Sequence, residues 1–193
     1  MDISSICIDN FYQDPDGVRE YALSQEYGVR GNYPGQRTEP FLNQSQFDII
    51  QSAVEPLAGK ITTWETEYTG SFQYTTARDR SWIHADDGCN WAGVCYLTPN
   101  APITSGTGLF QHKATGLLRA PRLQDGSIDN DLLDQIYLDA QDMTKWQMHQ
   151  MIGNVYNRLI LYRGDLFHTS LDYFGQDLHT GRLFQTFFFS TER

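Results

Sequence analysis

The sequence predicts a mainly β domain, either a closed barrel or a two-sheet jelly roll. Aromatic residues make up 13% of the chain and gather in short alternating runs, which favours strands over long helices. Eight such runs, separated by Gly, Pro and Asn, are predicted as strands at about 61–68, 71–76, 82–85, 92–98, 109–112, 155–162, 167–170 and 183–190. Eight short strands in one domain are typical of a barrel or jelly roll.

Helices are predicted before the strands and once between them. Asp14-Pro15 is typical of a helix start and predicts a short helix at about 15–23. Phe47, Ile50 and Val54 fall on one face of a second helix, which Pro56 and Gly59 end. Apolar residues then recur at helical spacing within 130–152, so this stretch is predicted to be a helix that interrupts the strands.

A length of 193 residues fits one domain. We expect residues 1–60 to form an N-terminal helical support, 61–193 the jelly-roll core, and 113–154 a helical insertion within it. A chain of this size buries roughly 70% of its unfolded surface, so a metal would be functional and not needed for folding. Three cysteines, Cys7, Cys89 and Cys95, show no CxxC spacing and are expected to be small buried side chains.

The charge balance excludes some partners. Lys and Arg number 14 against 24 Asp and Glu, which gives a formal net charge of −10. Such a surface repels phosphate, so neither a nucleic acid nor an anionic membrane is an expected partner. The chain also contains no apolar run of about 18 residues, and its first residues lack the features of a secretory signal. We therefore expect a soluble cytoplasmic protein.

Three residues are spaced to share one metal ion. In an extended strand, His84 and Asp86 project from the same face. His168 follows an apolar strand and a turn, which is a position at the mouth of a barrel. Two imidazoles and one carboxylate leave three positions open on an octahedral ion, as in non-haem Fe(II) oxygenases. This hypothesis requires the two imidazole rings to lie within about 8 Å of each other. The alternatives are an ordinary hydrogen-bonded pair for His84 and Asp86, and a turn position for His168.

Arg182 begins the last aromatic strand. A guanidinium inside an apolar barrel needs an anion, and a carboxylate bound through two hydrogen bonds would satisfy it. The alternative is a surface ion pair with an acid such as Asp177.

The order of these motifs resembles that of the Fe(II)- and 2-oxoglutarate-dependent dioxygenases, in particular the prolyl-4-hydroxylase-like branch. The resemblance covers about residues 61–193 without the inserted helix, and it implies a double-stranded β-helix, the jelly roll that cupins share. It rests on Gln73-Tyr74 ahead of His84, on Val94-Cys95-Tyr96-Leu97-Thr98-Pro99-Asn100, on Ser105-Gly106-Thr107-Gly108-Leu109-Phe110, and on Arg158-Leu159-Ile160-Leu161-Tyr162 ahead of His168.

The resemblance implies a role for each matching residue. His84, Asp86 and His168 would bind Fe(II), and Arg182 would pair with the distal carboxylate of the cosubstrate 2-oxoglutarate, assisted by the Tyr96 hydroxyl. An intact Asp86 argues against the halogenating relatives, in which a small residue replaces the carboxylate.

Two further residues belong to the implied cosubstrate site. Tyr74 would face the cosubstrate or the substrate. Many members carry a Ser or Thr two positions after the arginine. Here Phe184 occupies that position, and Thr186 is the candidate to supply the hydroxyl contact to the carboxylate instead. Core packing with a hydrogen-bonded hydroxyl is the alternative for Tyr74 and Tyr96.

The implied reaction hydroxylates a C–H bond of a peptide side chain or of a small metabolite such as an amino acid. It consumes O₂ and decarboxylates 2-oxoglutarate to succinate. Two other classes of function stay open. A cupin-like metalloenzyme without 2-oxoglutarate would not need Arg182, and a catalytically silent binding module would keep the barrel but not depend on metal. The insertion at 113–154 either forms part of a lid or dimer surface, or packs outside the barrel.

Overall fold

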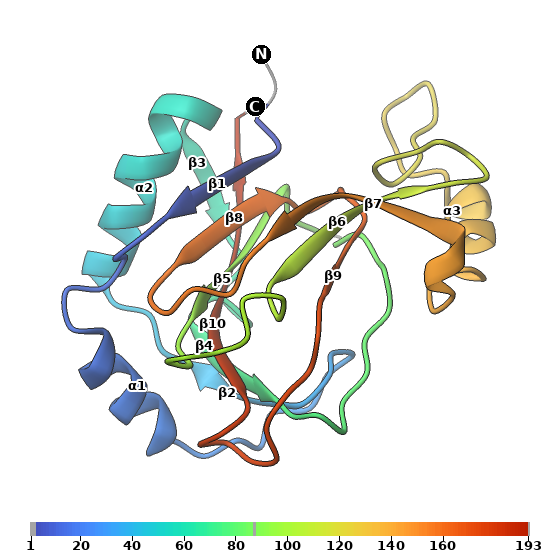
Figure 1. Ribbon diagram of the computed structural model, residues 1–193. Coiled ribbons are helices and arrows are strands. Elements are labelled where there is room, and N and C mark those ends of the chain that lie inside the picture. The colour runs from blue at the N-terminus through green and yellow to red at the C-terminus, as the bar shows by residue number, and fades with distance from the viewer. Residues whose placement is uncertain (1–2, 87, 193) are drawn as a thin grey trace.

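Two antiparallel sheets form the framework of residues 3–86 and 88–192, the part of the chain that the computed structural model describes (Figure 1). The larger sheet contains β1 (Ser5–Ile8), β2 (Gln36–Pro40), β3 (Ile61–Trp64), β4 (Ser71–Thr75), β5 (Trp91–Tyr96), β8 (Leu159–Arg163) and β10 (Arg182–Thr191). Its order is β1-β8-β5-β10-β4-β2, with β3 also paired to β10. In the smaller sheet, β6 (Thr107–His112) lies between β7 (Trp146–Ile152) and β9 (His168–Ser170). The predicted mainly β jelly-roll fold is confirmed.

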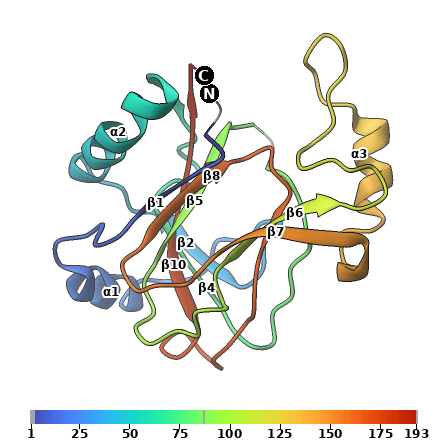
Figure 2. The same ribbon diagram turned by 45° about the horizontal axis from the view of Figure 1, so that its top comes forward.

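Helices flank the two sheets on opposite sides, as Figures 1 and 2 show. The helices α1 (Pro15–Leu23) and α2 (Gln44–Ala58) lie beside the larger sheet, and α3 (Asn130–Tyr137) lies beside the smaller one. The start of α1 agrees with the prediction, because the Asp14 side chain accepts a hydrogen bond from the backbone N–H of Gly17. No helix in the described ranges has the length and apolar character needed to cross a membrane.

The strand β10 separates two apolar layers because its side chains alternate between its faces. Leu183, Phe187 and Phe189 belong to the apolar cluster that also contains residues of α1 and α2. Phe184 and Phe188 instead belong to a second cluster that joins the two sheets. Even-numbered residues of β10, Arg182 included, therefore point into the space between the sheets.

A third cluster fixes the insertion. Ile136 of α3 and Trp146 of β7 pack against Ile83, Phe110 and Phe167. The helix therefore packs against the outside of the smaller sheet, which is one of the two arrangements that the sequence left open for it.

Several local predictions are corrected by the structure. The predicted helix at 130–152 ends at Tyr137, and a 3₁₀ turn at Met143–Lys145 leads into β7, because pairing with β6 satisfies the backbone of that segment. The N-terminal support contains two strands as well as its helices, since β1 pairs with β8 and β2 pairs with β4. These pairings join residues far apart in the sequence, so local periodicity did not indicate them.

Three further predictions are correct only in part. Pro56 does not end α2, which continues to Ala58, because a proline near the end of a helix removes only one hydrogen bond. Gly59, with φ of 83°, follows the last helical residue. Residues 82–85 form no regular strand, and only His84 makes an isolated bridge there. Of the three cysteines expected to be buried, Cys95 is buried, Cys89 is half-buried and Cys7 is exposed.

Asn157 fastens the N-terminal segment to the larger sheet. Its side chain accepts a hydrogen bond from the backbone N–H of Tyr12 at 2.8 Å and donates one to the Tyr12 carbonyl at 2.9 Å. The backbone of Asn157 is left-handed, with φ of 61°, a conformation in which asparagine is enriched. Both its side chain and its backbone therefore suit asparagine at this buried position.

We expect Asn157→Ala to lower the free energy of unfolding by about 2–4 kcal/mol, because two buried hydrogen bonds are lost and alanine is strained at positive φ. Asn157→Gly loses the same bonds without the strain, so it should be more stable than the alanine variant by about 1 kcal/mol. Urea unfolding measures both. Wild-type stability in both variants would contradict the role of the hydrogen bonds, and equal losses would contradict the backbone argument.

Candidate metal centre

A pair of backbone hydrogen bonds holds His84 beside His168. The N–H of His84 donates to the carbonyl of His168 at 3.0 Å, and the N–H of His168 donates to the carbonyl of His84 at 2.8 Å. Side chains of directly opposed residues in an antiparallel pair lie close together. The two imidazole centroids are accordingly 4.5 Å apart, well within the limit that a shared metal requires.

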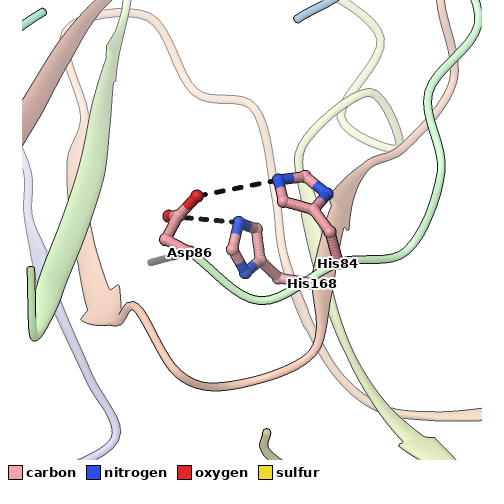
Figure 3. A group of neighbouring side chains, drawn as sticks. All are labelled: His84, Asp86 and His168. Carbon is pink, nitrogen blue, oxygen red and sulfur yellow. Dashed lines mark ion pairs between the residues drawn. The ribbon is translucent and has the colours of Figure 1, made fainter. Parts of the chain in front are cut away.

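Asp86 completes the group from the loop that follows His84. Its backbone N–H donates to the carbonyl of Gly164 at 2.7 Å, which holds this loop against the end of β8. In Figure 3 its two carboxylate oxygens point toward the two imidazoles, with Oδ1 at 3.7 Å from Nε2 of His84 and Oδ2 at 3.5 Å from Nε2 of His168. One ligand atom from each residue lies within 4.8 Å of the others.

The remaining ring nitrogens fix the orientation of both histidines. Nδ1 of His84 lies 3.0 Å from the carbonyl of Trp82, and Nδ1 of His168 lies 2.8 Å from the carbonyl of Leu166. A carbonyl only accepts, so Nδ1 carries the proton and Nε2 keeps its lone pair for a ligand when the ring is neutral. Such bonds orient metal-binding histidines in other proteins.

The charge states also fit a metal ion. Burial lowers the pKa of His168 to about 4, although the Asp86 carboxylate acts in the opposite direction. His168 is therefore neutral near pH 7. Oδ2 of Asp86 is buried and accepts no hydrogen bond, which is costly for a carboxylate oxygen. A divalent cation between the three groups would compensate that oxygen, and the set of two nitrogens and one oxygen suits such an ion.

A cavity of about 340 Å³ adjoins these three residues, and Arg182 contributes to its wall. The Arg182 side chain is only 1% exposed, its Nε donates to the carbonyl of Ser105 at 2.9 Å, and its Nη1 has no hydrogen-bond partner. Asp177 instead accepts hydrogen bonds from the backbone of His179 and from Thr180. No ion pair in the described part of the chain includes Arg182, so the surface pair with Asp177 is not formed.

Of the other residues expected to bind the cosubstrate, Tyr96 lies near this guanidinium, and Thr186 lines the same cavity. Cζ of Arg182 lies 5.2 Å from the centre of the Tyr96 ring, and the Tyr96 hydroxyl is 2.9 Å from the hydroxyl of Thr107. Thr107 and Thr186 line the cavity, whereas Tyr96 is fully buried and is not among the lining residues. The Thr186 hydroxyl donates to the Tyr68 carbonyl at 2.7 Å.

Tyr74 does not line the cavity, which corrects its expected position facing the cosubstrate or substrate. Its ring packs on Tyr27 with centroids 5.1 Å apart, in the cluster on the opposite face of the larger sheet. Its neighbour Gln73 lines the cavity instead. Successive residues of a strand face opposite sides of the sheet, so Gln73 faces the cavity and Tyr74, one position later, faces away from it.

Arg37 of β2 is a cavity residue that the sequence did not indicate. Its side chain is 6% exposed, and both Nε and Nη2 donate to Oε1 of Gln73, at 2.9 and 2.5 Å. Burial lowers the pKa of Arg37, although neighbouring Tyr33, Tyr68 and Asp86 act in the opposite direction. The short segment Gln36–Pro40 has no alternating pattern, so only its long-range pairing with β4 brings this arginine to the site.

Comparison with known proteins identifies the family and the fold. The chain belongs to a family described as a family of unknown function (DUF6445), whose model matches residues 3–189. No curated protein matches the sequence. Among solved structures, HygX from Streptomyces hygroscopicus with nickel, 2-oxoglutarate and hygromycin B bound is similar, with a TM-score of 0.61 and 12% identity over 98% of this chain and 83% of that one.

Two prolyl hydroxylases are also similar in structure. The enzyme from Trichoplax adhaerens, in complex with a peptide fragment of the oxygen degradation domain of hypoxia inducible factor, has a TM-score of 0.53 and 14% identity over 96% of this chain and 83% of that one. A prolyl-4-hydroxylase from Pseudomonas putida has a TM-score of 0.52 and 15% identity over 98% and 94%. At these identities the likeness establishes a shared fold.

We expect the metal-free protein to lose stability as the pH falls from 6.5 to 4. The folded-state pKa of His168, about 4, lies below the ordinary value of 6.5, so in this range the unfolded chain binds a proton that the folded chain does not. The loss contributed by His168 is absent above pH 6.5 and reaches about 3 kcal/mol at pH 4.

Urea unfolding across this pH range, with EDTA present, measures the effect. His168→Gln should reduce the pH dependence by that amount, and His179→Gln, at an exposed histidine, should leave it unchanged. A pH dependence that is the same in His168→Gln and the wild type would show that His168 is not held neutral by burial.

Proposed function

We propose that this member of the DUF6445 family is an Fe(II)- and 2-oxoglutarate-dependent dioxygenase that hydroxylates a C–H bond of a peptide side chain or of a small metabolite such as an amino acid. The observation that carries this proposal is a single cavity lined by both the His-Asp-His group and the buried, unpaired guanidinium of Arg182. A metal group alone fits many metalloenzymes. An arginine with an unused donor in the same cavity favours a cosubstrate that carries a carboxylate.

In this proposal His84, Asp86 and His168 hold the iron. The bound metal, with O₂ and 2-oxoglutarate, supplies the oxidising chemistry, so that R–H, O₂ and 2-oxoglutarate give R–OH, succinate and CO₂. The protein keeps the two imidazoles in place through their Nδ1 hydrogen bonds to backbone carbonyls. It keeps Asp86 in reach through the bond between its N–H and Gly164.

Arg182 orients the cosubstrate by binding its distal carboxylate. The Nε of Arg182 donates to the Ser105 carbonyl and Nη2 donates to the Gly106 carbonyl at 3.5 Å, which leaves Nη1 as the donor for a ligand. Tyr96 acts through Thr107: when the Tyr96 hydroxyl donates to the Thr107 oxygen, the Thr107 proton is free to donate into the cavity. Phe184, whose ring centre lies 4.5 Å from Cζ of Arg182, limits the access of water to this end. Exclusion of water strengthens the attraction between guanidinium and carboxylate.

The remaining parts of the proposal concern the chain as a whole. Residues 1–193 act as one domain, with 1–60 as support for the jelly roll and 113–154 as an insertion beside the site. The partner is a small-molecule or peptide substrate in the cytoplasm, and no nucleic acid or membrane is involved. Solved structures of similar fold hold a peptide fragment in one case and hygromycin B in another, which agrees with either size of substrate.

We expect the Fe(II)-loaded protein to form succinate from 2-oxoglutarate without added substrate. Each of His84→Ala, Asp86→Ala and His168→Ala should lower succinate formation by at least about 100-fold, because one metal ligand is lost. NMR detection of succinate measures this, and His179→Ala, at an exposed histidine, is the matched control.

Calorimetric titration with Ni(II) and then 2-oxoglutarate separates the competing functions. Binding of Ni(II) without 2-oxoglutarate would favour the cupin-like metalloenzyme. A wild-type protein that binds neither would favour a binding module that does not depend on metal.

We expect Arg182→Gln to raise the Kd for 2-oxoglutarate by about 10–100-fold, because charge-assisted hydrogen bonds to the carboxylate are lost. Arg182→Lys should fall between this variant and the wild type, since it keeps the charge but not the planar fork. Affinity for Ni(II) should not change. The exposed Arg78→Gln is the control, and an unchanged Kd in Arg182→Gln would contradict the assigned role.

A further inference from the structure

The cavity contains a second buried arginine that the proposed reaction leaves unused. A guanidinium carries five N–H donors. In Arg37, the two hydrogen bonds that Nε and Nη2 make both go to one neutral oxygen, Oε1 of Gln73. No hydrogen bond or ion pair of its Nη1 occurs in the described residues, and none of the ion pairs there includes Arg37. Within the part of the chain that the structure describes, a positive charge that is 6% exposed thus forms no ion pair with an acidic side chain.

The surroundings of Arg37 hold its guanidinium rigidly and leave an edge free. Its Cζ lies 3.7 Å from the centre of the Tyr33 ring and 5.2 Å from that of Tyr68. Rings over the faces of a guanidinium stabilise it but do not occupy its in-plane donors. Gln73 is itself fixed, because its Nε2 donates to the Pro34 carbonyl at 2.6 Å. All four of these neighbours line the same cavity as Arg37.

The position of Arg37 separates it from the expected cosubstrate end. Arg37 is opposite Gln73 on β4, and Gln73 is opposite Phe184 on β10. Strands lie about 4.8 Å apart, so the backbone of Arg37 is about 10 Å from that of Phe184 on β10, the strand that carries Arg182. Two distinct cationic groups therefore line one cavity with the metal ligands.

The acidic groups near Arg37 have other partners or another role. Glu65 also lines the cavity, and its two carboxylate oxygens accept hydrogen bonds from the backbone N–H groups of Glu67 and Tyr68, at 2.8 and 2.9 Å. Asp86 belongs to the metal group. Neither forms an ion pair with Arg37, so the guanidinium is available to an anionic ligand.

We propose that Arg37 is a substrate-binding residue that recognises a carboxylate, so that the substrate class is a carboxylate-bearing molecule. This inference rests on the proposed function, because it takes the cavity to be the active site. The carboxylate is either the free α-carboxylate of a small molecule or an acidic side chain of a peptide. Arg182 binds the cosubstrate, and Arg37 binds the substrate at the β2 side of the cavity.

The test measures binding to the protein saturated with Ni(II) and 2-oxoglutarate, by calorimetric titration. One arm compares free L-amino acids with their primary amides. The other compares capped peptides containing Asp or Glu with the same peptides containing Asn or Gln. In at least one of these two comparisons, the ligand that carries the carboxylate should bind at least about tenfold more tightly than the matching neutral ligand.

Variants of Arg37 decide whether this residue is responsible. Arg37→Gln should abolish the preference for the carboxylate member, and Arg37→Lys, which keeps the charge, should retain part of it. Both should bind Ni(II) and 2-oxoglutarate as the wild type does, which also shows that they are folded. Arg78→Gln, at an exposed arginine, is the control and should keep the full preference.

Two results would overturn the inference: no carboxylate preference in either arm, or a preference that persists in Arg37→Gln. Loss of 2-oxoglutarate binding in Arg37→Gln would also overturn it, because Arg37 would then serve the cosubstrate. Failure of the proposed function is distinguishable, since it appears as a wild-type protein that does not bind Ni(II) and 2-oxoglutarate. If the wild type binds neither Ni(II) nor 2-oxoglutarate but still prefers carboxylate ligands, and Arg37→Gln loses that preference, the role of Arg37 in binding a carboxylate would still be supported.

Discussion

The reciprocal hydrogen bonds between the backbones of His84 and His168 are the constraint on which the site depends. They join the loop after β4 to the start of β9, although 84 and 168 are far apart in the sequence. The bridge places the imidazoles side by side. Asp86, two residues after His84, directs its carboxylate toward both rings. Backbone pairing therefore assembles a group of side chains that could hold one metal ion, and the jelly roll supplies the rigid frame for it.

Around the cavity, three charged groups lack the partners that buried charges normally have. Among the described residues, Oδ2 of Asp86 and Nη1 of Arg182 form no hydrogen bond, and Arg37 forms no ion pair. Each of these groups costs stability in the ligand-free protein, and a bound cation or carboxylate would offset that cost. The proposed metal ion and the two proposed carboxylate ligands have charges opposite to those of these three groups.

Short alternating runs of aromatic residues, such as the one in β10, predict the mainly β fold. The spacing of His84 and Asp86, read as an extended strand, indicates a shared metal ion, and their side chains do lie together although residues 82–85 form no regular strand. Prediction from the sequence failed where long-range pairing decides the outcome. The β7 segment carries no strand pattern of its own. The resemblance assigns Tyr74 to the site, whereas the register of β4 turns Gln73 toward the cavity. Arg37 reaches the cavity through the pairing of β2 with β4. Such pairings depend on the whole sheet and leave little local signal.

A crystal structure of the protein with Ni(II) and 2-oxoglutarate would show whether His84, Asp86 and His168 bind one metal ion. We expect an anomalous scattering peak about 2 Å from Nε2 of His84, Nε2 of His168 and a carboxylate oxygen of Asp86, with the distal carboxylate of 2-oxoglutarate on Arg182. A metal bound elsewhere, or a 2-oxoglutarate molecule that does not contact Arg182, would contradict this expectation.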